Sequence, residues 1–301
     1  MQYKTSSNYI GIFLVISSSF CYTILNCILK KIGHNLPPLI LVFYRNLFLI
    51  LILLPFLIFL IAYRKNTSGL FHKNNLLLNI VRGSLGFLGI CFWVMAVSKL
   101  PITECIAISF TTPLFITLLA ILILKEKVSI TKWGCLFIGF FGAIIVMSPD
   151  FTKLSFYSLL VLAAAMLWAA SAIVIKTFVT YHHPVPVIFF TSFISLLLSV
   201  PALTQNPILP SNKQLLLLFI SSMLSALAQV LMGFAYKNSP ITVVIPFDFT
   251  RLIFASIIAY FLFNEIISIS TIIGSIMIIV STSFIVFSEA KLKNVKARNT
   301  P

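Results

Sequence analysis

Four ionisable side chains stand inside otherwise apolar stretches of this 301-residue sequence: Arg45, Arg82, Asp248 and Arg251. A charge inside a membrane costs at least about 2.5–3.5 kcal/mol on insertion scales, so residues of this kind are candidates for binding a charged ligand. Asp248 and Arg251 are three positions apart, which places them on one helix face within contact distance. Two hypotheses stay open for the pair: mutual neutralisation alone, or neutralisation together with substrate contact.

The other two arginines differ in their surroundings. Arg45 lies between Tyr44 and Asn46, a polar triplet in a stretch otherwise built from Leu, Ile and Phe. Three polar groups facing lipid would be unfavourable, so we expect Arg45 to face a cavity. Arg82 is closer to the start of its segment, where a long side chain can reach the membrane surface. Glu104 begins the next segment, either as an acid favoured by the helix dipole or as a gate carboxylate.

Aromatic residues and prolines complete the candidate site. Trp93 and Trp168 lie well inside apolar segments, where an indole can stack on a planar or cationic substrate. Phe110 is expected to add to this wall. Pro113 and Pro246 interrupt two segments, because each removes a backbone donor and frees a carbonyl one turn earlier. Broken helices are tolerated in membranes where they line protein or water, so both prolines are predicted to have gating or structural roles.

The elements that must position these residues are membrane-spanning helices. Of the residues, 60% are hydrophobic and only 9% charged, with a mean hydropathy of +1.10. Soluble chains carry roughly 25% charged residues, so an ordinary soluble enzyme is excluded, and so is a disordered chain. Ten apolar segments are each long enough to cross a bilayer; they run approximately 10–30, 38–62, 76–97, 102–124, 129–148, 155–175, 185–203, 214–236, 240–263 and 266–287. The third, fourth and fifth segments are joined by very short connections, so nine or eleven spans are the alternatives to ten.

The basic residues orient these segments. With the N-terminus inside, thirteen Lys and Arg fall in inner loops or the tail and five in outer loops. By the positive-inside rule, we expect an inner-membrane protein with both termini in the cytoplasm. The net charge of +15 is spread over short loops, which favours membrane lipids as partners and excludes nucleic acid. The five cysteines all lie in apolar stretches without metal-ligand spacing, so no metal site or cofactor is expected.

An internal repeat divides the chain. Residues 96–131 match 235–270 at a constant offset of 139 with twelve identities, among them Pro101 with Pro240, Phe110 with Phe249 and Glu126 with Glu265. The start of each half matches at an offset of 146, through Lys30 with Lys176 and Pro38 with Pro184. Five helices per half is an odd number, so the halves must be inverted. We expect an all-α polytopic membrane protein, with repeats at 1–150 and 151–290 and a basic tail at 291–301.

Several motifs resemble the EamA type of the drug/metabolite transporter superfamily. They are Arg82, Leu-Pro-Ile-Thr-Glu-Cys at 100–105, Thr-Thr-Pro-Leu-Phe at 111–115, Leu-Lys-Glu-Lys at 124–127, Trp133-Gly134, Gly139-Phe-Phe-Gly142, Trp168, Lys176 and Asn264-Glu265. Phe-Tyr-Arg at 43–45 and Ala-Tyr-Phe-Leu-Phe-Asn-Glu at 259–265 resemble the rickettsial S-adenosylmethionine uptake carriers within it. The resemblance implies ten helices in two inverted repeats and transport of a metabolite.

The sequence therefore predicts a secondary transporter of a small polar or zwitterionic metabolite, working by alternating access as a monomer or homodimer. Its site is expected between the halves, lined by the second, third, fourth, sixth, eighth and ninth segments. Asp248, Arg251 and Arg45 would supply charge, and Trp93, Trp168 and Phe110 a wall. The alternatives are a membrane-embedded enzyme acting on lipid and a non-transporting subunit of a membrane complex. Walker motifs are absent, which argues against ATP-driven transport. A lipid-acting enzyme would need His, Asp or Ser side chains that converge at one depth, and Asp248 is the one acid deep in a predicted span while no predicted span holds a histidine.

Overall fold

The fold is all-helical in the computed structural model. The structure describes residues 5–33, 35–63, 73–124, 130–147, 155–176, 184–201, 203, 208–239 and 247–298. Within these ranges, the helices are α1 (Thr5–Gly33), α2 (Pro38–Tyr63), α3 (Lys73–Val97), α4 (Ile102–Ser109), α5 (Thr112–Leu124), α6 (Ile130–Met147), α7 (Phe156–Lys176), α8 (Pro184–Ser199), α10 (Asn212–Asn238), α12 (Thr250–Phe263) and α13 (Ile269–Arg298).

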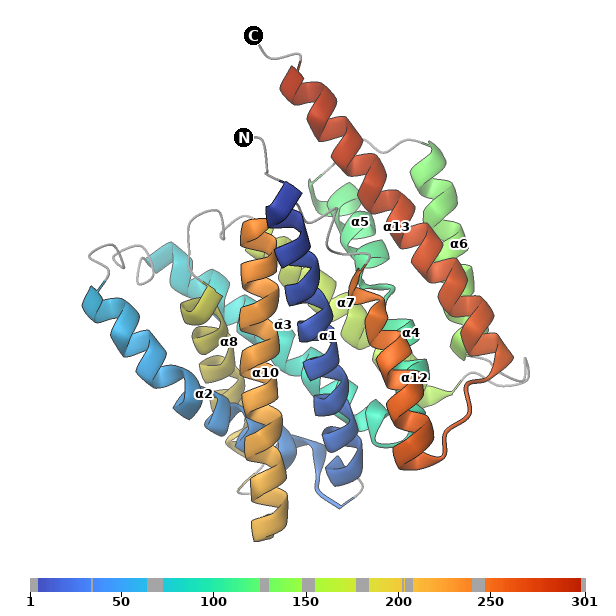
Figure 1. The fold of residues 1–301 in the computed structure, drawn as a ribbon. Helices are drawn as coiled ribbons and strands as arrows, with labels where there is room; N and C mark the ends of the chain where they lie inside the picture. The colour runs from blue at the N-terminus through green and yellow to red at the C-terminus, as the bar shows by residue number, and fades with distance from the viewer. Residues whose placement is uncertain are drawn as a thin grey trace.

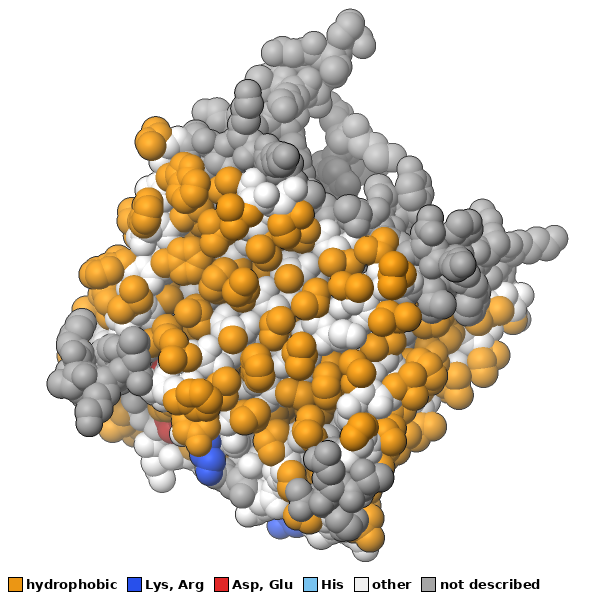
Figure 2. Space-filling view, turned by 180° about the vertical axis from the view of Figure 1, so that it is seen from behind, with side chains coloured by type: hydrophobic (Ala, Val, Ile, Leu, Met, Phe, Trp, Pro, Cys, Tyr) orange, Lys and Arg blue, Asp and Glu red, His pale blue; other side chains and the backbone are white. Residues whose placement is uncertain are grey.

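Length and composition make this a multi-pass membrane protein. Six apolar helical stretches of the described chain are long enough to span a bilayer, and α4 with α5 counts as one of them, Ile102–Ile123. Four shorter apolar helices lie in α6, α8, α12 and α13, which gives the ten segments that the sequence predicts. Hydrophobic side chains cover the face seen in Figure 2, with the few charged ones at its edge. So wide an apolar surface fits lipid rather than water.

The fourth segment is broken where the sequence places Pro113. Helix α4 ends at Ser109, and Pro113 is the second residue of α5, where a missing backbone donor costs little. The Ser109 carbonyl accepts a hydrogen bond from the Thr112 hydroxyl at 2.7 Å. In the second half, α12 begins at Thr250, one residue after Phe249. The two helix starts are close to equivalent in the repeat. Pro246 lies outside the described residues, as does Glu126.

The packing of the helices follows the internal repeat. Helix α1 packs on α10, and its repeat equivalent α7 packs on α3; α2 lies against α10 as α8 lies against α3, and α12 against α1 as α5 against α7. Two equivalent pairs pack on each other, namely α2 with α8 and α6 with α13, and the second pair runs side by side in Figure 1. Such pairing is what an internal two-fold requires. The predicted boundary near residue 150 falls in 148–154, outside the described ranges.

Phe110 and Phe249 mark the place of this two-fold. The two residues are equivalent at the offset of 139, and their rings pack edge to face with centroids 4.8 Å apart. A residue that touches its own equivalent must lie close to the axis that relates the two halves. Figure 1 shows the N- and C-termini at the same end of the bundle, as an even number of spans demands. We call the opposite end, which holds residues 98–101 and 264–268, the loop end.

Candidate functional site

A cavity of about 570 Å³ lies in the middle of the bundle, within the range typical of small-molecule sites. Eight helices or their ends line it. The lining residues are Tyr22, Leu25, Asn26, Arg45, Asn46, Leu49, Arg82, Gly86, Ile90, Trp93, Thr112, Trp168, Ser171, Ala172, Thr191, Ser192, Ser195, Ser225, Gln229, Met232, Asp248 and Arg251. Five of the six residues predicted to bind substrate therefore line this cavity, and so does Arg82.

The cavity lies on the two-fold between the repeats. At the offset of 146, Arg45 of α2 corresponds to Thr191 of α8, and Asn46 corresponds to Ser192; all four line the cavity. The other lining pairs at this offset are Tyr22 with Trp168, Leu25 with Ser171, Asn26 with Ala172, and Leu49 with Ser195. Equivalent positions share the cavity, while the residue types differ. One half therefore offers charge where the other offers hydroxyls.

Asp248 and Arg251 form an ion pair. The Arg251 Nη2 donates to Asp248 Oδ1 at 2.6 Å and to Oδ2 at 2.7 Å, across the three-residue spacing that the sequence shows. Asp248 also accepts from the Ser19 hydroxyl at 2.8 Å. The Arg251 guanidinium lies over the Tyr22 ring, 5.0 Å from its centroid. The carboxylate is thus held by α1 and α12 together, and its charge is largely balanced.

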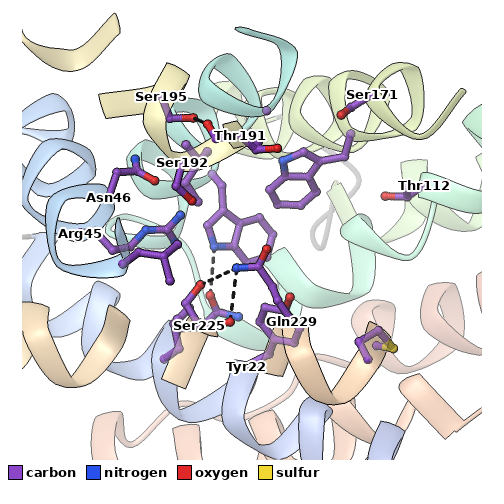
Figure 3. A pocket seen from close by; sticks show the side chains of 18 of the residues that line it. Tyr22, Arg45, Asn46, Thr112, Ser171, Thr191, Ser192, Ser195, Ser225 and Gln229 are labelled. Carbon is purple, nitrogen blue, oxygen red and sulfur yellow. Dashed lines mark hydrogen bonds between the residues drawn. The ribbon is translucent and has the colours of Figure 1, made fainter. Parts of the chain in front are cut away.

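Arg45 is the cavity arginine whose charge stays unbalanced. Its Nε is buried and has no hydrogen-bond partner, and no carboxylate of the described chain forms an ion pair with it. Its side chain points into the cavity beside Asn46 (Figure 3). The backbone around it is fixed, because the Arg45 carbonyl accepts from the Ser222 hydroxyl of α10 at 2.8 Å. A fixed, unpaired cation in a low-dielectric cavity favours an anionic group on the ligand.

Trp93 and Trp168 form the apolar wall that the sequence predicts. Their ring centroids are 5.4 Å apart at an interplanar angle of 46°. Trp93 is held by its indole N–H, which donates to Asn26 Oδ1 at 3.1 Å. Trp168 fits against α3 because residue 89 is glycine; a Cβ there would come within 2.6 Å of the indole nitrogen. The pair offers one face to a planar or cationic group.

Gly89→Ala should therefore weaken substrate binding through Trp168. The added methyl group must displace the indole, and we expect an increase of about tenfold in the dissociation constant, corresponding to about 1.4 kcal/mol. Binding of labelled substrate to the purified protein measures this. Gly134→Ala is the matched control, because nothing lies within 4 Å of a Cβ at that position. Equal effects of the two variants would contradict the role of Gly89.

Phe110 does not line the cavity. It is 5% exposed and caps α4, with its ring turned to Phe249. Phe110 does lie at the interface between the two halves, as the sequence predicts. Its ring packs against Phe249, the equivalent residue of the other half, and therefore does not face the cavity. Glu104, in the first turn of α4, accepts from the Ser158 hydroxyl of α7 at 2.6 Å and also lies outside the cavity. Its gating role stays a prediction, as do those of Arg82, Pro113 and Pro246.

The sequence reasoning missed the contributions of α1 and α8. Tyr22 and Asn26 come from α1, and Thr191, Ser192 and Ser195 from α8. The signal that could have found the α8 residues is the repeat itself: adding 146 to Arg45 and Asn46 gives Thr191 and Ser192. For α1, the same offset relates Tyr22 to Trp168, which the sequence does single out.

The loop end of the bundle is closed by buried ionic contacts, which we call the loop-end clamp. The ammonium of Lys30 at the end of α1 forms an ion pair with Glu265 and donates to the Leu100 carbonyl at 2.6 Å. Glu265 Oε2 also accepts from the backbone N–H of Ile102, at the start of α4, at 3.1 Å. Asn264 allows Glu265 to reach Lys30 and Ile102, since its left-handed backbone (φ 52°) turns the chain sharply after α12.

A dry layer separates the cavity from the loop-end clamp. One helical turn beyond Asn26 and Trp93 lie Leu29 and Val97, which pack in one core cluster with Ile102 and Ile106. All four of the packed side chains are 0% exposed. The cavity is therefore sealed toward the loop end by packing and by an ion pair. A cavity that lies on an internal two-fold within a membrane bundle and contains charged side chains is the architecture of a secondary transporter.

Comparison with known proteins agrees with this class. The EamA-like transporter family model matches residues 9–148 and 155–287. The chain belongs to the EamA-like transporter family, and it is a transporter rather than an enzyme. A solved crystal structure with 13% sequence identity has a TM-score of 0.63 and covers 96% of this chain and 99% of its own, which shows the shared fold.

Named relatives differ in their substrates. An S-adenosylmethionine uptake transporter of Rickettsia bellii is 32% identical over 97% of this chain and 98% of its own length. A riboflavin transporter of Vibrio cholerae is 26% identical over 96% of both chains. A pseudopaline exporter of Pseudomonas aeruginosa is 22% identical over 90% of this chain and 94% of its own. Membership of the family therefore does not by itself assign a substrate.

Proposed function

We propose that this protein moves a small polar or zwitterionic metabolite, S-adenosylmethionine or an amino-acid-like compound, across the inner membrane by alternating access. The observation that carries the proposal is Arg45, a buried cation without an ion-pair partner among the described residues, in a cavity that also holds a tryptophan pair. A substrate carboxylate balances Arg45, and the planar or cationic part of the substrate packs on Trp93 and Trp168.

The balance of charge supports a substrate with an acidic group. Three arginines and one aspartate line the cavity, and Asp248 is already engaged by Arg251 and Ser19. A substrate with only positive charge would enter a site with surplus positive charge. S-Adenosylmethionine fits the cavity because its carboxylate meets Arg45, while its ammonium and sulfonium centres pack on the aromatic faces or share Asp248 with Arg251.

Asp248→Asn tests the cationic half of this assignment. The change keeps the volume and removes the charge, so uptake of a substrate with a cationic centre should fall about tenfold or more, at a normal amount of protein in the membrane. Radiolabelled uptake into proteoliposomes measures it. Ser19→Ala is the milder control, since it removes only the hydrogen bond to Asp248. Unchanged affinity and rate in Asp248→Asn would reduce Asp248 to a structural partner of Arg251.

Alternating access requires the sealed end to open. The loop-end clamp and the dry layer beyond Asn26 block the cavity on that side, so we propose that the transport cycle breaks the contact between Lys30 and Glu265 and separates α1 from α4. The helix breaks at Ser109–Thr112 and at Phe249 lie beside the two-fold. Such breaks let half-helices move without unfolding the rest of the bundle.

We also propose how the protein is oriented in the membrane and how many chains transport requires. The excess of basic residues places the termini in the cytoplasm and the loop end outside. Reporter domains inserted between α2 and α3 and between α8 and α10 should therefore report opposite sides of the membrane; reporters on the same side would contradict the topology. The cavity is complete within one chain, so a monomer suffices for transport.

We propose that the substrate moves by exchange or by facilitated movement, without coupling to a proton gradient. Asp248 is the carboxylate that lines the cavity, and it is already engaged by Arg251 and by the Ser19 hydroxyl, so the described residues offer no uncommitted carboxylate there for coupling to an ion gradient. Counterflow should therefore stimulate uptake: unlabelled substrate inside proteoliposomes accelerates entry of the labelled compound, and a protonophore has little effect. The reverse pattern would indicate proton symport.

Uptake into proteoliposomes decides the function. We expect saturable entry of labelled S-adenosylmethionine, with inhibition by compounds that retain its amino-acid part and weak inhibition by riboflavin, which has no carboxylate for Arg45. Dominant uptake of riboflavin would replace the proposed substrate class. Absence of uptake for all of these compounds would overturn it.

A further inference from the structure

Two buried serine residues of the cavity wall carry hydroxyl groups that the described part of the protein does not use. Ser171 of α7 is 8% exposed and Ser192 of α8 is 4% exposed, and both line the cavity. Neither hydroxyl forms a hydrogen bond with any part of the chain that the structure describes. Figure 3 shows Ser192 on the same side of the cavity as Arg45 and Asn46, and Ser171 beside an indole ring.

Neighbouring hydroxyls in the same wall have partners. Ser195 donates to the Thr191 carbonyl at 2.9 Å, the usual arrangement for serine in an apolar helix. Ser225 accepts from the side-chain amide of Gln229 at 3.0 Å. Ser195 follows Ser192 by less than one turn of α8, and both residues line the cavity. They differ in that, within the described residues, the Ser195 hydroxyl bonds to the backbone and the Ser192 hydroxyl does not. Ser192 and Ser171 therefore keep the hydrogen-bonding capacity that Ser195 and Ser225 have already used.

Each unused hydroxyl stands beside one half of the proposed ligand. Ser192 is the repeat equivalent of Asn46, which neighbours Arg45, and α8 packs directly on α2. It therefore lies at the end of the cavity where a carboxylate binds. Ser171 follows Trp168 by three residues on α7, which puts the two side chains on one helix face. It therefore lies at the edge of a ring stacked on the tryptophan pair.

We propose that Ser171 and Ser192 determine the specificity of this site, resting on the proposed function. Ser192 hydrogen-bonds the acidic end of the substrate together with Arg45. Ser171 hydrogen-bonds the edge of a polar planar heterocycle stacked on Trp168. The site thereby selects a substrate that carries both a carboxylate and a hydrogen-bonding heterocycle, and it discriminates against amino acids without a ring. A substrate lacking either part leaves a buried hydroxyl without a partner, which lowers its affinity.

Competition binding with three probes separates the two roles. Labelled S-adenosylmethionine is bound to purified protein in nanodiscs and displaced by methionine or by adenosine, which carry the two halves of the ligand. Ser171→Ala should raise the dissociation constants of S-adenosylmethionine and adenosine about fivefold and leave that of methionine unchanged. Ser192→Ala should raise those of S-adenosylmethionine and methionine about fivefold and leave that of adenosine unchanged.

Ser199→Ala on the same helix is the matched control, since its hydroxyl bonds to the Leu196 carbonyl and the residue does not line the cavity, and it should change no constant. Removing an unpartnered hydroxyl does not destabilise the fold, so Ser171→Ala and Ser192→Ala should keep the thermal stability of the wild type. Equal changes for all probes in Ser171→Ala, or no change for S-adenosylmethionine, would overturn this inference alone. Wild-type protein that binds none of the three probes would overturn the proposed function as well.

Discussion

Replacing Arg45 by methionine should abolish uptake of carboxylate substrates and raise the thermal stability of the protein. The guanidinium is buried without an ion-pair partner among the described residues, so its desolvation is not offset in the empty protein. Taking this charge out of the bundle removes a cost of about 2.5–3.5 kcal/mol on insertion scales. The substrate carboxylate then loses a charge-assisted hydrogen bond, and uptake should fall about 100-fold or more.

The combination of lost uptake and gained stability distinguishes Arg45 from a residue that holds the fold. Thermal unfolding of the purified protein and uptake into proteoliposomes measure the two effects. Arg45→Lys should retain a fraction of the activity, since it keeps the charge but not the bidentate geometry. Arg251→Met is the matched control: it leaves Asp248 without its ion-pair partner and should lower both stability and uptake. A destabilised Arg45→Met protein would contradict the assignment.

Breaking the loop-end clamp should expose the cavity from the loop end. Lys30→Met leaves Glu265 as a partly buried carboxylate without its cation, a change that typically costs about 3–5 kcal/mol where the pair is fully buried. The side chain of Lys30 is 9% exposed and that of Glu265 is 15% exposed, so water screens the pair only partly. We expect this energy to favour states in which the loop end opens and Glu265 is hydrated.

Cysteine labelling reports this opening. Cys105 of α4 is 0% exposed, close to the dry layer under the clamp. In a variant that keeps only this cysteine, Lys30→Met should accelerate its reaction with a membrane-impermeant thiol reagent at least tenfold. The double variant with Glu265→Met should return labelling toward the wild-type rate, because both charges are then absent. Unchanged labelling in Lys30→Met would show that the dry layer alone seals the cavity.

Much of the fold can be predicted from the sequence because its signals are local. The length of an apolar run limits what can cross a bilayer, and ten such runs lead directly to a helical membrane bundle. The break near Pro113 follows from proline chemistry within one turn. The pairing of Asp248 with Arg251 follows from a three-residue spacing on one helix. The repeat between 96–131 and 235–270 likewise requires only comparison of the chain with itself.

The composition of the site depends on contacts between distant segments. Trp93, Trp168 and Arg45 are singled out by residue type and do line the cavity. Phe110 is singled out by the same criterion, yet its ring packs against Phe249 and does not line the cavity. Ser192 looks like any serine of an apolar helix, and only the tertiary structure reveals that its hydroxyl lacks the bond that Ser195 makes.

The sequence by itself therefore determines the class of protein, the ten spans, the internal repeat and most of the charged candidates. The tertiary structure decides which charges are balanced, which hydroxyls are unused, and that α1 and α8 contribute to the cavity. The physical reason lies in the solvent. In water, apolar residues that recur with the period of a helix reveal its inner face. In a membrane, both faces of a helix are apolar, so only packing against the other helices decides which side chains face the cavity.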